Sequence, residues 1–123
     1  MHVLTQGLVD LGLLSGQTDD VIEQQGYRKF YMHRTGHWLG MDVHDVGAYM
    51  DQKGKSRKFK PGMVLTIEPG IYISKKNKNV PSQYRGIGIR IEDDVLVTKS
   101  GCDVLTKALP KEIDEVESIM AKN

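Results

Sequence analysis

Cysteine is almost absent from the chain, because Cys102 is the single one among 123 residues. One thiol excludes an internal disulfide framework and is typical of the reducing cytosol, so we expect a cytoplasmic protein. The apolar runs are only a few residues long, which excludes a membrane-spanning helix. The first residues carry neither a basic segment nor a small-residue cleavage site, so the sequence predicts no secretory signal.

An excess of charge of one sign is lacking as well. The chain has 17 basic and 16 acidic residues, and its formal net charge is +1. This balance argues against a nucleic-acid-binding protein, which normally shows a concentrated basic excess. With 39% hydrophobic and 27% charged residues, the composition is that of a soluble globular protein. The length predicts one domain.

Three short segments have the apolar spacing of amphipathic helices. They are residues 4–14, the residues up to Glu23 that follow a polar cap at 18–20, and a last helix opened by Pro110 with an apolar stripe of Ile113, Val116 and Met120. The polar, basic segment 51–60 is interpreted as a solvated loop. The chain therefore has helix at both ends.

Two segments alternate between apolar and other residues, as strands do. The first is 63–68, which Pro69-Gly70 ends and which restarts at 71–73; the second is 87–98. Strands of this kind beside terminal helices predict an α+β fold with a largely antiparallel sheet. An all-helical fold or a doubly wound parallel sheet would contradict this prediction.

Three of the four histidines, His33, His37 and His44, fall within twelve residues. Arg34 follows His33 where the HExxH motif of zinc peptidases requires a glutamate, so that motif is absent. From the residues alone, a structural role and a catalytic role for these histidines remain equally open.

Two glutamates, Glu68 and Glu92, lie in otherwise apolar strands, where a carboxylate is rarely buried unless it is paired or bound to a metal. Arg90 leaves the same strand face as Glu92, so an internal salt bridge is one interpretation. In the other, one imidazole and two carboxylates hold Mn²⁺ or a similar cation and leave positions for water and substrate. The remaining histidines would then handle protons or stabilise an oxyanion.

Three blocks of sequence together resemble the C-terminal part of the Xaa-Pro aminopeptidases (aminopeptidase P) of the pita-bread metallopeptidase family. They are HRTGHWLG at 33–40 with DVHDVG at 42–47, PGMVLTIEPG at 61–70, and YRGIGIRIEDD at 84–94. The resemblance in order and spacing covers nearly the whole chain. It implies that residues 1–123 are the C-terminal half of a pita-bread catalytic domain, an α+β fold whose curved, mainly antiparallel sheet is backed by helices.

The resemblance also implies a role for individual residues. It implies metal ligation by three of them: His37, Glu68 and Glu92, the last bridging two ions. It implies catalytic roles for three more: His33 and His44 beside substrate and tetrahedral intermediate, and Arg90 orienting the carboxylates. The implied cofactor is Mn²⁺, two ions per intact site, although other divalent metals would suit the same ligands.

The implied activity is hydrolysis of a peptide with proline in second position, which releases the residue before the proline. The Trp38-Leu39-Gly40 sequence and the run at 84–90 are similar to this proline-directed branch, whereas a proline dipeptidase remains an alternative. Trp38 also has a simpler interpretation, as a residue that fills the core.

Two aspartate ligands of the family belong to an upstream strand, and no aspartate in the helical segments at the start of this chain matches their motif. We therefore expect a chain that is inactive alone, with the metal ligands retained. A non-catalytic pita-bread module that binds proteins is the alternative.

Half of a shared sheet exposes an apolar face and strand edges, so self-association into a homo-oligomer is expected.

Overall fold

The computed structural model describes residues 1–122, which divide into two compact units. Unit 1 comprises Met1–His33 and Gly70–Arg90, and unit 2 comprises Arg34–Pro69 and the residues from Ile91 onward. Every strand pair in the two units is antiparallel. Helices accompany these strands, which confirms the α+β class. Within the described residues, no helix is long and apolar enough to cross a membrane.

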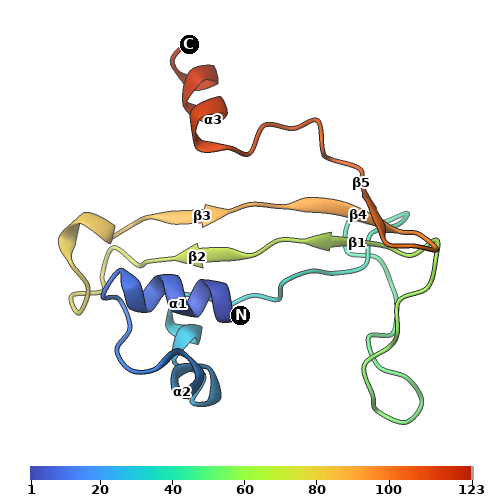
Figure 1. Cartoon of the computed structure of the whole chain (residues 1–123), viewed down its shortest axis with the longest axis horizontal. Coiled ribbons are helices and arrows are strands. Elements are labelled where there is room, and N and C mark those ends of the chain that lie inside the picture. Colours follow the sequence, from blue (N-terminus) through green and yellow to red (C-terminus); the bar gives the residue numbers. More distant parts are fainter. Residues whose placement is uncertain (123) are drawn as a thin grey trace. The chain divides into compact units, whose positions relative to one another are not determined.

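Unit 1 combines short helices with one strand pair (Figure 1). Its elements are α1 (His2–Asp10), α2 (Thr18–Glu23), η1 (Gly26–Lys29), β2 (Gly70–Tyr72), η2 (Ser82–Tyr84) and β3 (Gly88–Arg90). Leu8 of α1 packs with Phe30, Ile73 and Val80 in the buried core. Both predicted N-terminal helices are present, but the predicted cap of the second is wrong: Gln17 is the N-cap, and Thr18 is already helical and buried.

Unit 2 is built on a three-stranded sheet of order β1-β4-β5. Its elements are β1 (Val64–Ile67), β4 (Asp93–Val97), β5 (Cys102–Val104) and α3 (Ile113–Met120). The segment 35–39 runs antiparallel along the other edge of β1. Its hydrogen bonds are Leu39 N to Val64 O, Thr66 N to His37 O, and Glu68 N to Thr35 O. Strand β1 is therefore paired on both sides.

The prediction of one strand over 87–98 is wrong, because the segment is divided into β3 and β4 with Ile91 and Glu92 between them. The backbone N–H of Ile91 donates to Pro69 O at 3.2 Å. Pro69 has no N–H with which to return a bond, so the ladder is interrupted at this point.

The last helix also differs from the expectation. It begins at Ile113 with Glu112 as N-cap, and not at Pro110. Its apolar stripe is not part of a core, since Ile113 and Met120 are 74% and 69% exposed. Residues 51–60, in contrast, are all exposed, which agrees with the interpretation as a solvated loop.

Candidate metal centre

The register of β1 and β4 places two carboxylates opposite each other. Thr66 pairs with Asp94 and Ile67 with Asp93, so Glu68 and Glu92 are next in the same register. Side chains directly opposite on antiparallel strands have Cβ atoms about 5 Å apart, and like charges there are destabilising. Two carboxylates in this position therefore favour a cation between them.

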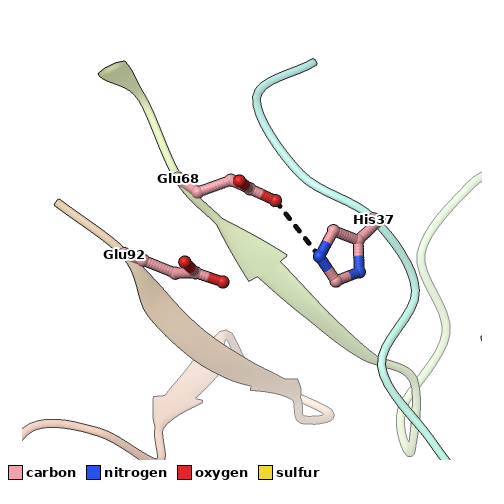
Figure 2. A group of neighbouring side chains, drawn as sticks. All are labelled: His37, Glu68 and Glu92. Atoms are coloured by element: carbon pink, nitrogen blue, oxygen red, sulfur yellow. Dashed lines mark ion pairs between the residues drawn. The ribbon is translucent and has the colours of Figure 1, made fainter. Parts of the chain in front are cut away.

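The third member, His37, comes from the segment that runs along β1. Its Nε2 lies 3.2 Å from Glu68 Oε1, and Figure 2 shows Glu92 beside this pair. One possible ligand atom from each of His37, Glu68 and Glu92 lies within 4.8 Å of the other two. Glu68 is buried, His37 is half-buried and Glu92 is exposed. The structure thus brings the three residues together from separate segments, while their role as ligands stays a prediction.

The ring of His37 has the orientation expected of a metal ligand. Its Nδ1 lies 2.9 Å from the carbonyl oxygen of Trp38. Since a carbonyl oxygen only accepts, Nδ1 carries the hydrogen and donates it. A neutral ring then presents the Nε2 lone pair to Glu68 Oε1, so either a proton or a cation must lie between these two atoms. One imidazole nitrogen and two carboxylates fit a divalent ion such as Mn²⁺ or Zn²⁺.

His44 lies beside this cluster, and its implied catalytic role stays a prediction. Its ring centroid is 4.2 Å from that of His37, and the two rings are tilted by 57°. His44 is exposed, so its imidazole faces solvent while it stays next to the candidate ligand.

The other two predicted catalytic residues, His33 and Arg90, belong to unit 1. The His33 ring stacks on Tyr31 with centroids 5.2 Å apart and meets Tyr72 edge-on at 5.4 Å. Arg90 Nε donates a 2.7 Å hydrogen bond to the Tyr72 hydroxyl. Tyr72 thus contacts both residues, and the predicted roles of the two towards the metal ligands stay predictions.

A pocket of about 450 Å³ opens beside His37 and is walled by aromatic residues. Trp38 stacks on Tyr49 with centroids 5.6 Å apart and meets Phe59 edge-on at 6.3 Å. Trp38 is half-buried and lines this pocket, so it does not belong to a closed core. The sequence pattern does not predict this role for Tyr49 and Phe59, which lie just before and within the polar, basic segment 51–60.

Asp93, the neighbour of Glu92, is engaged elsewhere. Lys111 Nζ lies 2.6 Å from its Oδ1, and the Thr106 hydroxyl donates to the same oxygen at 2.6 Å. The hydrogen bond from Lys111, followed by that from Thr106, holds the pKa of Asp93 below its ordinary value of 3.8. Asp93 is therefore a charged partner of Lys111 and not a spare ligand for the cluster.

The family model of metallopeptidase family M24 matches residues 5–99. The chain belongs to this family. It is 58% identical to the Xaa-Pro aminopeptidase of Haemophilus influenzae over 98% of this chain and 27% of that protein. It is 50% identical to the Xaa-Pro aminopeptidase of Escherichia coli K12 over 98% of this chain and 26% of that protein.

Among solved structures, that of Pseudomonas aeruginosa aminopeptidase PepP matches with a TM-score of 0.94 and 56% identity. The match covers 98% of this chain and 27% of that one. At this similarity the chain has the fold of the corresponding part of a pita-bread aminopeptidase, as the sequence implies. It spans about a quarter of the length of the relatives that it matches.

Proposed function

We propose that the chain is part of the catalytic domain of an Xaa-Pro aminopeptidase, with a divalent metal held by His37, Glu68 and Glu92. The observation that carries the proposal is the convergence of these three side chains to within 4.8 Å from separate segments of unit 2. The proline-directed specificity is supported by the identity to two Xaa-Pro aminopeptidases, which is 50% or more over nearly the whole chain.

The residues divide the chemistry between them. When bound, a divalent ion supplies Lewis-acid chemistry towards the scissile carbonyl. His37 contributes Nε2, because Nδ1 is engaged with Trp38 O, and the two glutamates contribute oxygens that hard and borderline ions such as Mn²⁺ favour. His44, next to His37, is placed to hold a proton near the reacting groups. In this proposal Glu92 would also help to hold a second ion, His33 would contact the substrate, and Arg90 would orient the carboxylates.

We also propose that this chain alone hydrolyses its substrate with little turnover. Two unit charges 4 Å apart repel by about 4 kcal/mol at an effective dielectric near 20, and two divalent ions by about four times as much. The family's two additional aspartates would offset this repulsion, and no matching motif occurs here. A second ion should therefore bind more weakly than the first.

We also propose that the chain self-associates, which is supported by the exposed apolar stripe of α3. We place it in the cytoplasm, which is supported by its single, exposed cysteine.

A chimera tests the activity directly. The 120-residue region of the Haemophilus influenzae relative that matches this chain is replaced by the chain itself. Hydrolysis of a tripeptide and of a dipeptide, each with proline in second position, is measured with Mn²⁺ in excess. We expect turnover of the tripeptide that Glu92→Gln abolishes, whereas Glu117→Gln, on the exposed surface of α3, leaves it unchanged.

The two substrates separate the alternatives. Cleavage of the dipeptide alone would indicate a proline dipeptidase. A folded chimera that binds Mn²⁺ and cleaves neither substrate would refute the proposed activity and favour the non-catalytic module.

A further inference from the structure

A buried hydroxyl sits between two of the candidate ligands. Thr66, in the middle of β1, is only 2% exposed. Valine has nearly the same shape and a high strand propensity, whereas a buried hydroxyl is costly unless it is hydrogen-bonded. A threonine at this position therefore calls for an explanation in terms of what its hydroxyl contacts.

The hydroxyl of Thr66 bonds to both neighbours. It donates to Glu68 Oε1 at 2.9 Å and accepts the backbone N–H of His37 at 3.0 Å. The backbone N–H of Thr66 in turn donates to His37 O at 2.9 Å. A hydroxyl has a single hydrogen, so the direction of both bonds is determined. The hydroxyl hydrogen is donated to the carboxylate of Glu68, and a lone pair of the hydroxyl oxygen accepts the backbone N–H of His37.

The bond to Glu68 selects one orientation of its carboxylate. The oxygen that accepts from Thr66 is the same Oε1 that lies 3.2 Å from His37 Nε2. A carboxylate oxygen has two lone pairs, so Oε1 can accept from Thr66 and still face the cluster. The same side chain also fixes the backbone from which the His37 ring projects. One hydroxyl thus sets the position of two ligands relative to each other.

We propose that Thr66 is a positioning residue of the metal centre, which holds Glu68 and His37 in the arrangement that binds the ion. The inference rests on the proposed function, because it concerns the same site. Partners that orient metal ligands in this way typically change metal affinity by about tenfold to a hundredfold when they are removed. We therefore expect the loss of the Thr66 hydroxyl to weaken metal binding by more than the accompanying loss of fold stability would explain.

The test compares two variants of the chain by calorimetric titration with Mn²⁺. Thr66→Val keeps the shape and removes the hydroxyl, and Thr66→Ser restores the hydroxyl. We expect binding about tenfold to a hundredfold weaker in Thr66→Val and close to wild type in Thr66→Ser. The electron paramagnetic resonance spectrum of bound Mn²⁺ should broaden in Thr66→Val only, because it reports the symmetry of the ligands and not the stability of the fold.

Thr18→Val is the control, since it removes the hydrogen bond that another buried threonine donates to a side-chain oxygen, from Thr18 to Gln6 in unit 1. It should lower the melting temperature and leave Mn²⁺ affinity unchanged. Equal affinity in Thr66→Val and wild type, or equal weakening in Thr66→Ser and Thr66→Val, would overturn the inference. Glu68→Gln tests the site itself. If it binds Mn²⁺ as tightly as wild type, the proposed metal centre fails, whereas loss in Glu68→Gln with no change in Thr66→Val refutes only the role of Thr66.

Discussion

Gly36 is a position at which the addition of one methyl group should disturb the candidate site. It lies in the segment that runs along β1, one residue before His37. A Cβ atom built on Gly36 would stand 2.0 Å from the backbone oxygen of Thr66 and 3.1 Å from its carbonyl carbon. Close carbon–oxygen contacts in proteins are about 3.3 Å or longer. Gly36→Ala must therefore push the segment away from β1 by about 1 Å.

A displacement of this size breaks the hydrogen bonds that hold the segment in place. Those at risk join Thr66 N to His37 O at 2.9 Å, Glu68 N to Thr35 O at 2.6 Å and the His37 N–H to the Thr66 hydroxyl at 3.0 Å. Each contributes about 0.5–1.5 kcal/mol net. The loss of backbone freedom in the unfolded chain returns about 0.4–1 kcal/mol. We expect Gly36→Ala to lower the free energy of unfolding by about 1–4 kcal/mol.

Urea unfolding followed by circular dichroism measures this loss, and Mn²⁺ titration measures its consequence for the site. Gly101→Ala is the control, because no atom lies within 4 Å of the added methyl group, and it should stay within about 0.5 kcal/mol of wild type. The reasoning is refuted if the free energy of unfolding of Gly36→Ala lies within the same margin of wild type and the variant binds Mn²⁺ as tightly as wild type does. The pairing of this segment with β1 would then not position His37.

Three further outcomes follow from the structure. Gly7→Ala in the middle of α1, where the added methyl group meets nothing within 4 Å, should raise the free energy of unfolding by about 0.5–1 kcal/mol; a lower melting temperature would contradict this. Lys111→Met should destabilise the chain above pH 3.8, the ordinary pKa of Asp93. Because that pKa is lowered in the folded state, the difference from wild type should fade as the pH falls through the folded value, and a pH-independent difference would speak against the ion pair. Glu92→Gln should weaken Mn²⁺ binding in calorimetry while Glu117→Gln does not, and equal affinities would exclude Glu92 as a ligand.

The sequence predicts strand β1 but not the face that it buries. Alternation over 63–68 separates Leu65 and Ile67 from Thr66 and Glu68. In the structure Thr66 and Glu68 are buried, at 2% and 7% exposed, while Ile67 is 45% exposed. The apolar face of the strand is thus the one that is more exposed to solvent. Periodicity reports only that two faces differ; which of them is covered depends on segments that are distant in the sequence, here the one that carries His37.

The convergence of the ligands could not be derived from local sequence either. Glu68 faces Glu92 only in the observed register of β1 and β4, and a slip by one residue would turn Glu92 to the opposite side of the sheet. No short turn joins these strands, so no turn type fixes the register. Asp93 offers a physical reason for it. Lys111 and Thr106 hold its carboxylate, and successive side chains on a strand alternate, so the contacts of Asp93 favour the placement of Glu92 on the side of His37. The resemblance to the family supplied the ligand set because it carries this register with it, whereas spacing and composition supplied only the residue types.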